Sequence, residues 1–188
     1  MSIKYYLILD VEATCCVLGN IPSQEMEIIE FGAVVLDGTS YKLISEFQSL
    51  VKPVLHRRLT QFCINLTGIK QEEVDVAKKF PEVIAILKKW LSSFSDFDFY
   101  SWGDYDRKQI ERDCRFHNIP NPIIASHYNL KKRFSEYCGS TKSYGLKSAL
   151  KKVGLELKGR HHRGLDDAKN IAHLFAHMSQ KIDSSTTL

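Results

Sequence analysis

Short apolar runs rich in β-branched and aromatic residues, separated by polar turns, occupy the first third of the chain. Three of them predict strands at residues 5–12, 28–36 and 42–52. The first run is almost continuously apolar, as in a strand that is buried on both faces. Asp37 and Gly38 lie between the second and third runs and predict an antiparallel hairpin, with a loop longer than two residues.

Helical spacing of apolar residues dominates after residue 80, beginning with a stripe over residues 81–94. Further helices are predicted at residues 105–117, 130–137, 146–153 and from Gly164 onward, and further strands at residues 97–102 and 127–129. Three strands followed by alternating helices and strands predict an α/β fold with a central mixed five-stranded sheet flanked by helices. Because no linker interrupts the pattern, we expect one domain over residues 1–180 and a polar, frayed tail at 181–188.

Composition adds modest constraints. The 188 residues carry a net charge of +4, which suits a polyanionic partner but does not by itself predict one. The five cysteines contain no CxxC pair, which favours a reducing compartment over secretion. The N-terminal apolar run ends at Asp10 and is too short for a signal peptide or a membrane span. We therefore expect a cytoplasmic protein that does not bind membranes.

Four carboxylates and one histidine stand beside the predicted elements. Asp10 and Glu12 end the first strand, Asp106 lies at a strand-to-helix junction, and His162 precedes Asp167 of the last helix by five residues. Residues two apart on a strand point to the same face, so Asp10 and Glu12 repel each other unless a cation lies between them. Carboxylate oxygens bind hard divalent ions, and an imidazole can accept a proton from water. This combination is what metal-dependent phosphodiester hydrolysis requires.

Simpler structural roles stay open on the residues alone. Asp10 and Glu12 can mark a strand end at the surface, and Asp106 and Asp167 can cap helices. His162 can be a solvated loop residue. Neighbours of the same type offer the same chemistry: Asp104, Asp166 and His161.

The order of five segments resembles one family, the DEDDh exonucleases. The segments are DVEATC, EIIEFGAVV, FCINLTGI, SWGDYD and GRHHRGLDDAKN, and the likeness covers about residues 3–178. It is strongest to the branch that contains the histone-mRNA 3′ exonuclease and KapD-like proteins. The resemblance implies a ribonuclease H-like fold and a metal-dependent 3′→5′ exonuclease domain. It also implies removal of nucleoside 5′-monophosphates from single-stranded or short RNA.

The resemblance also implies roles for individual residues. Two Mg²⁺ ions, with Mn²⁺ as the alternative, would be bound by Asp10, Glu12, Asp106 and Asp167, and His162 would be the general base. One ion would activate the attacking water and the other would stabilise the leaving 3′ oxygen, with Asp10 bridging the two. On this assignment His161 and Asp166 fall outside the set.

Substrate contacts are predicted on the same basis. They comprise base stacking by Phe62 and Tyr105, ribose contacts near Ala13 and Thr14, and phosphate contacts by Arg160 and Arg163. A core position for Phe62 and a capping role for Tyr105 are the structural alternatives. RNA is expected as the partner rather than DNA.

Two other functions stay open: a DNA-directed exonuclease of the same superfamily, and a catalytically idle nucleic-acid-binding module. The presence of all five residues argues against the idle module, and the spacing of His162 argues against a ribonuclease H-type endonuclease. The first strand starts near residue 3, so we expect a stand-alone trimming enzyme without the accessory domain of some relatives. Nothing in the sequence identifies a dimer face.

Overall fold

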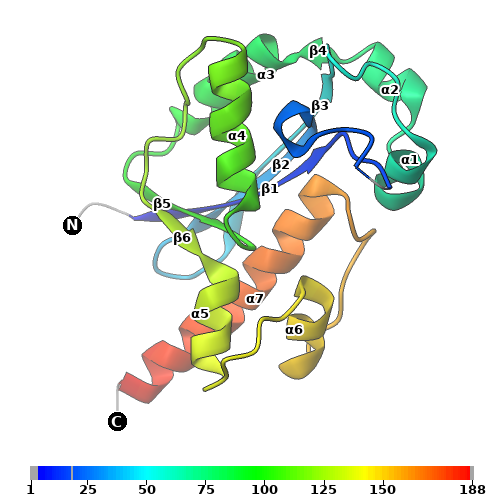
Figure 1. The fold of residues 1–188 in the computed structure, drawn as a ribbon. Helices are drawn as coiled ribbons and strands as arrows, with labels where there is room; N and C mark the ends of the chain where they lie inside the picture. The colour runs from blue at the N-terminus through cyan, green and yellow to red at the C-terminus, as the bar shows by residue number, and fades with distance from the viewer. Residues whose placement is uncertain (1–3, 18, 187–188) are drawn as a thin grey trace.

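A computed structural model describes the backbone of residues 4–17 and 19–186, and the side chains of residues 4–17 and 19–181. It shows a six-stranded mixed sheet with helices on both faces (Figure 1). The strands are β1 (Tyr5–Ala13), β2 (Ile28–Asp37), β3 (Leu43–Lys52), β4 (Lys78–Lys79), β5 (Phe97–Ser101) and β6 (His127–Asn129). The helices are η1 (Ser23–Glu25), α1 (Gln61–Thr67), α2 (Gln71–Asp75), α3 (Phe80–Leu91), α4 (Tyr105–Phe116), α5 (Leu130–Tyr137), α6 (Leu146–Lys152) and α7 (Gly164–Thr186).

The order of the strands across the sheet is β4-β3-β2-β1-β5-β6. β2 pairs antiparallel with both β1 and β3, which confirms the predicted hairpin, whereas β5 runs parallel to β1. The mixed α/β class is confirmed, but the prediction of five strands was one short. The missing strand, β4, has two residues and lies parallel to β3, so it is too short to show any alternation in sequence.

Two short helices were also missed, because five to seven residues do not establish a helical period. α1 is defined by its ends: the hydroxyl of Thr60 accepts a hydrogen bond from the N–H of Cys63, and Gly68 ends the helix with φ of 73°. At the other end of the chain, α7 continues to Thr186 and so includes residues 181–186, which the sequence analysis assigned to a polar tail. No helix of the described residues is long and apolar enough to cross a lipid bilayer.

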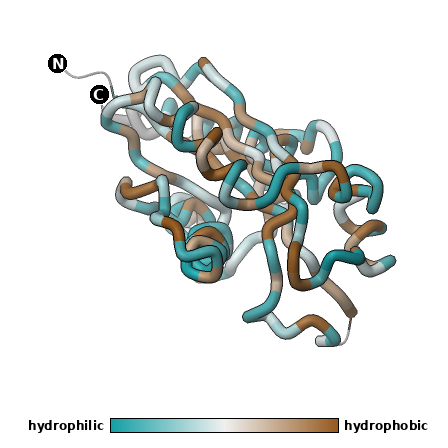
Figure 2. The backbone as a smooth tube through the Cα atoms, turned by 90° about the horizontal axis from the view of Figure 1, so that it is seen from above, coloured by the Kyte–Doolittle hydropathy of each residue, from teal (hydrophilic) through white to brown (hydrophobic). Residues whose placement is uncertain are grey.

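The sheet separates two hydrophobic cores, and alternate residues of β1 enter each. Leu7, Leu9 and Val11 pack with α3 and α4, whereas Ile8 packs with α5, α6 and α7. Viewed from above, hydropathy alternates along the helices as expected for elements with one buried face (Figure 2). Because side chains alternate along a strand, Asp10 and Glu12 lie on the same side as Ile8. The two acids therefore face the layer that contains α7.

α7 begins in direct contact with β2. A Cβ atom added at Gly32 would overlap the backbone of Gly164, so only glycine allows the helix to approach the strand this closely. The N–H of Gly164 donates a hydrogen bond of 2.9 Å to the carboxylate of Glu30, also on β2. This contact positions the first turn of α7, which carries Asp167, beside the end of β1.

Candidate active site

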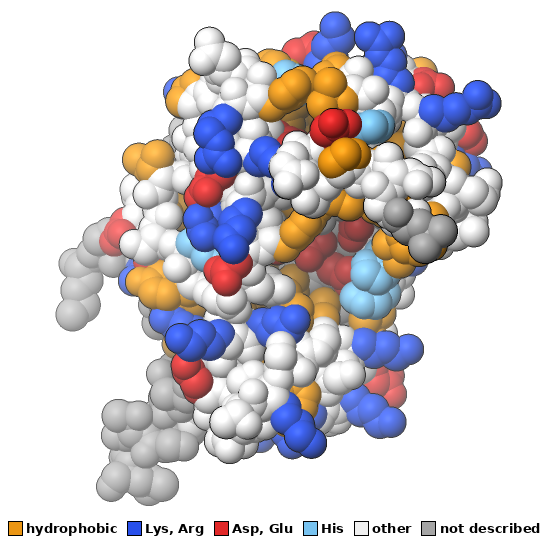
Figure 3. All heavy atoms as spheres, viewed as in Figure 1, with side chains coloured by type: hydrophobic (Ala, Val, Ile, Leu, Met, Phe, Trp, Pro, Cys, Tyr) orange, Lys and Arg blue, Asp and Glu red, His pale blue; other side chains and the backbone are white. Residues whose placement is uncertain are grey.

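A cavity of about 310 Å³ lies where β1, α4, α6 and α7 meet. It is lined by Asp10, Val11, Glu12, Trp102, Tyr105, Asp106, Leu146, His161, His162 and Asp167. Figure 3 shows acidic side chains recessed in a hollow of the molecular surface, with histidine side chains at its edge. The structure thus brings together the four acids and the histidine that the sequence placed far apart.

Three of the acids form a close group of oxygen ligands. Asp10, Glu12 and Asp167 each offer one carboxylate oxygen, and these oxygens lie within 4.8 Å of one another. Asp106 lines the same cavity but is outside this group, and its Oδ1 accepts a hydrogen bond of 3.0 Å from the N–H of Val11. An all-oxygen donor set with excess negative charge fits a hard divalent cation such as Mg²⁺ or Mn²⁺.

Crowding of negative charge in a buried place perturbs these carboxyl groups. Burial, together with the charges of Asp106, Glu12 and Asp167, raises the pKa of Asp10 well above its usual range. Burial and then the charge of Asp167 raise the pKa of Glu12 to about 8. Burial also raises the pKa of Asp106 to about 6, although the N–H of Val11 opposes this effect. Without a cation, the site therefore retains protons that ordinary carboxyl groups would have lost.

These shifts predict how stability depends on pH. The folded protein holds protons on Glu12 and Asp106 more tightly than the unfolded chain, so metal-free stability falls as pH rises from about 4 to about 8. A divalent cation should remove this fall, because it neutralises the same charges. The measurement is the melting temperature from pH 5 to 8, in EDTA and in Mg²⁺, for the wild type and Glu12→Gln. We expect the variant to lose less stability with pH in EDTA; parallel curves would contradict the assignment.

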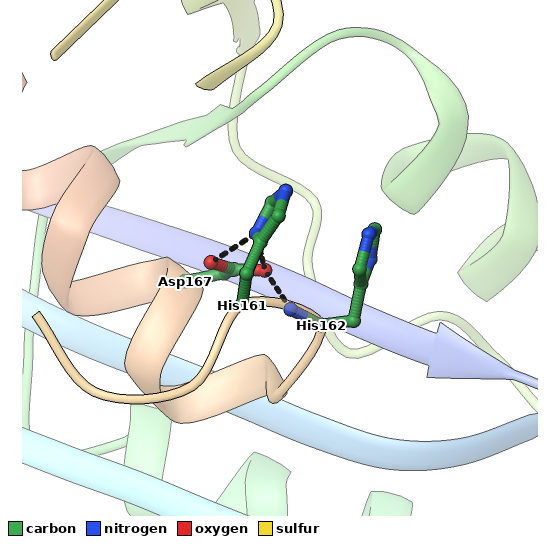
Figure 4. Close-up of side chains that lie close together, drawn as sticks. All are labelled: His161, His162 and Asp167. Atoms are coloured by element: carbon green, nitrogen blue, oxygen red, sulfur yellow. Dashed lines mark hydrogen bonds and ion pairs between the residues drawn. The ribbon is translucent and has the colours of Figure 1, made fainter. Parts of the chain in front are cut away.

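Two adjacent histidines stand over Asp167 (Figure 4). The Nδ1 atom of His161 is 3.0 Å from each carboxylate oxygen of Asp167, and the backbone N–H of His162 donates to Asp167 Oδ2 at 2.8 Å. Burial and the neighbouring His161 lower the pKa of His162, outweighing the opposite effect of Asp167. The lowered pKa keeps the His162 ring neutral near pH 7, with one nitrogen free to accept a proton.

His161 was placed outside the site by sequence, yet its ring binds Asp167 directly. The cause is the backbone: His162 has φ of 65°, a left-handed conformation that is uncommon for residues other than glycine. This turn brings the two rings to the same side, with their centroids 4.0 Å apart. The spacing to Asp167 carries no information about that turn, so sequence reasoning had no signal for it.

Glu30 is a second residue that the sequence analysis did not single out. Its fully buried carboxylate accepts hydrogen bonds from Nε and Nη2 of Arg163 at 3.2 and 3.0 Å, and another from the N–H of Gly164. Gln48 donates a further bond of 2.7 Å. The sequence did contain a signal, because Glu30 is the one charged residue in the apolar run IIEFGAVV. Such a buried charge needs a partner, and here the partner holds the histidine turn against the sheet.

Replacing Glu30 with glutamine should destabilise the protein by about 3 kcal/mol, since it leaves the guanidinium of Arg163 without its charged partner. The histidine turn would then be held less firmly, so hydrolysis should fall as well. Urea denaturation and initial rates measure the two effects. Glu46→Gln is the matched control, because Glu46 forms an exposed ion pair with Lys169 of α7 that should contribute less than about 1 kcal/mol. Equal losses in both variants would contradict the anchoring role of Glu30.

The residues predicted to bind substrate differ in their exposure to solvent. Tyr105 lines the cavity and is 48% exposed, while Phe62 is 40% exposed on α1. Ala13 and Thr14 are buried, and the hydroxyl of Thr14 accepts a hydrogen bond from the N–H of Glu27.

The two arginines that were predicted to contact substrate phosphates both bind other parts of the protein. Arg163 is bound to Glu30, and its side chain is still 24% exposed, so its phosphate contact stays a prediction. Arg160 is exposed, and its Nη2 donates to the carbonyl of Asn65 at 3.3 Å. Trp102 and Leu146 line the cavity but were not predicted, because nothing distinguishes them in sequence from core residues.

Comparison with known proteins gives consistent findings. The RNase_T family model, described as Exonuclease, matches residues 7–175. The chain is 35% identical to 3'-5' exoribonuclease 1 of Mus musculus over 94% of this chain and 53% of that protein. It thus spans about half the length of the curated relatives it matches.

Solved structures confirm the ribonuclease H-like fold expected from the resemblance. The nuclease domain of 3'hExo, described as a DEDDh family member bound to rAMP, superposes with a TM-score of 0.88 at 34% identity. The superposition covers 94% of this chain and 92% of that domain. A 3'-exonuclease structure described by its recognition of the histone mRNA stem-loop superposes with a TM-score of 0.87 at 31% identity. It covers 96% of this chain and 84% of the other.

Proposed function

Because the chain belongs to the RNase_T exonuclease family, we propose that it removes nucleoside 5′-monophosphates from the 3′ end of single-stranded or short RNA. The observation that carries the proposal is the meeting of Asp10, Glu12 and Asp167 within 4.8 Å, in one cavity with Asp106 and His162. The surface around this hollow carries many lysine and arginine side chains, which suits a polyanionic substrate (Figure 3).

The residues of the site have distinct roles in this proposal. Asp10, Glu12 and Asp167 would hold divalent cations, with Asp106 of α4 contributing from the same cavity. When bound, such ions supply a more acidic water and neutralise the charge that develops on phosphate and leaving oxygens. Mg²⁺ is the proposed ion, with Mn²⁺ as the alternative.

His162 would accept the proton of the attacking water. Its lowered pKa supplies the neutral form, and its backbone N–H binds Asp167, so the ring is held next to the acids. His161 orients Asp167 through its two 3.0 Å contacts and so helps to fix the direction of the carboxylate oxygens. Arg163 and Glu30 hold the turn that carries both histidines.

The substrate class is supported by the relatives. The curated relatives at 35% identity are named exoribonucleases, and one of the solved neighbours is described with a histone mRNA stem-loop. For this chain we propose single-stranded RNA over DNA as the partner, and a cytoplasmic location on the basis of the cysteine pattern.

The test is the time course of a 5′-labelled RNA, with the matched DNA, in Mg²⁺ and in EDTA. We expect a ladder that shortens from the 3′ end of the RNA only when Mg²⁺ is present. Faster degradation of DNA would favour the DNA-directed alternative. Binding of both nucleic acids without cleavage in Mg²⁺ or Mn²⁺ would favour the idle binding module.

Stacking of the terminal bases on Phe62 and Tyr105 is part of the same proposal. Replacing either ring with alanine should weaken substrate binding by about 1–3 kcal/mol, which is the range for a base stacked on an aromatic side chain. The effect should appear in KM measured on a short RNA, with little change in kcat. Phe116→Ala is the control, because this ring is 50% exposed at the far end of α4. Unchanged KM in both variants would remove stacking from the proposal.

A further inference from the structure

A second group of metal-binding atoms lies in the same cavity and shares Asp167 with the oxygen cluster. One ring nitrogen of His161, one of His162 and one oxygen of Asp167 lie within 4.8 Å of one another. Figure 4 shows the two rings rising side by side from one turn, next to the carboxylate. Two imidazole nitrogens and a carboxylate oxygen suit Zn²⁺ and similar transition-metal ions, whereas Mg²⁺ prefers oxygen alone.

We propose that His161, His162 and Asp167 form a binding site for Zn²⁺, and that an ion bound there inhibits the enzyme. The binding follows from the geometry of these three side chains. The inhibition rests on the function proposed above, because it requires His162 and Asp167 to act in hydrolysis. A histidine nitrogen that coordinates a metal has no lone pair left for a proton. Asp167, once it coordinates this ion, would no longer be available as a ligand to the oxygen cluster of Asp10 and Glu12.

The side chains of His161, His162 and Asp167 need to move little to coordinate an ion. Ligands of a tetrahedral zinc ion lie about 3.3 Å apart, given bonds of about 2.0–2.1 Å. Nδ1 of His161 is already 3.0 Å from both oxygens of Asp167. The left-handed backbone of His162 keeps its ring beside that of His161, so a side-chain rotation brings the third ligand into place. The fourth position of the tetrahedron would face the cavity and take a water molecule.

Solvent can reach this group of ligands. The side chain of His161 is 38% exposed, while that of Asp167 is 4% exposed. An ion would therefore meet His161 first and the carboxylate second. The two overlapping sites select by ion type: Asp10, Glu12 and Asp167 offer only oxygen, whereas the histidine group offers nitrogen. His161 supplies the second nitrogen ligand. Its removal should therefore weaken the nitrogen-containing site and leave the oxygen cluster intact.

The test is isothermal titration of the full chain with Zn²⁺ in the absence of Mg²⁺. His161→Asn should bind Zn²⁺ about tenfold more weakly or worse, since even changes beyond the metal ligands cost about 10–100-fold. His173→Asn, an exposed histidine on α7, is the matched control and should bind as the wild type does. Equal affinity in wild type and His161→Asn would overturn the proposal. Should His161→Asn fail to fold by circular dichroism, His162→Asn tests the same site with the same expected loss.

Co²⁺ in place of Zn²⁺ gives an independent readout. Visible absorption of four-coordinate cobalt, without a sulfur-to-metal band, is expected in the wild type and should be lost in His161→Asn. A sulfur-to-metal band that disappears in Cys63→Ser would instead place the ion at Cys15 and Cys63, which pack in one cluster, and would overturn the proposal.

Inhibition is measured as Mg²⁺-supported RNA hydrolysis against rising Zn²⁺, each variant relative to its own rate without Zn²⁺. His161→Asn should need about tenfold more Zn²⁺ than the wild type for half inhibition. Equal sensitivity would overturn the inhibitory role. A chain that hydrolyses no nucleic acid but shows the expected Zn²⁺ affinities would refute the proposed function and leave the metal site standing.

Discussion

Asp10→Asn is expected to abolish hydrolysis, with a loss of kcat/KM well beyond the about 10–100-fold typical of residues that only support metal ligands. Asp10 belongs to the acidic group, and the charges of Asp106, Glu12 and Asp167 all raise the pKa of its carboxyl. Asparagine keeps the shape of the side chain but removes the charge that would hold a cation. The measurement is the initial rate of 3′ shortening of labelled RNA in Mg²⁺.

Loss of activity through unfolding can be separated from loss of the site. Removing one of several repelling buried charges should leave the metal-free melting temperature of Asp10→Asn unchanged or raised. The increase in melting temperature that Mg²⁺ gives the wild type should disappear in this variant. Asp104→Asn is the matched control, since Asp104 precedes α4, is exposed and does not line the cavity. Full activity in Asp10→Asn would refute the proposed mechanism.

His162→Asn should lower kcat by about 10²–10⁴-fold, the usual contribution of general acid–base catalysis. KM and the stabilisation by Mg²⁺ should change little, because the acids remain and the backbone N–H of residue 162 still binds Asp167. Single-turnover rates with saturating RNA measure the chemical step directly. The expected signature is therefore a slow enzyme that still binds its metal and its substrate.

The two histidines can be ranked with the same assay. His161→Asn should cost less than His162→Asn, since the ring of His161 is already bound to the carboxylate of Asp167. His173→Asn on the exposed side of α7 serves as the unaffected control. A greater loss at His161 would move the role of base from His162 to its neighbour.

Long apolar patterns allowed most of the fold to be predicted from sequence. The strands predicted at residues 5–12 and 28–36 correspond to Tyr5–Ala13 and Ile28–Asp37, because burial on both faces requires continuous apolar runs. β4, α1 and α2 were missed, since each is shorter than the pattern needed to recognise it. Their existence depends on tertiary contacts and on end caps such as Thr60.

The candidate site, like the fold, contains some residues that could be predicted from sequence and others that could not. Strand alternation placed Asp10 and Glu12 on one face, and helical patterning placed Asp167 in the first turn of the last helix, with His162 in the loop before it. His161 lies in the site because the backbone of His162 has a positive φ angle, and the spacing of residues along the sequence does not reveal such an angle. The pairing of Arg163 with Glu30 could not be predicted from local sequence, because the two residues are 133 positions apart. The roles of these residues in catalysis stay predictions.

The contact between Gly32 and Gly164 has a consequence for biosynthesis. Asp10 and Glu12 leave the ribosome early, but the turn with His162 and the first turn of α7 come at least a hundred and fifty residues later. A nascent chain that ends before Gly164 contains all six strands of the described sheet, but it lacks Asp167 and the contact between Gly32 and Gly164 that positions it. Growing chains, which emerge beside messenger RNA, would thus lack a complete site until the last helix docks.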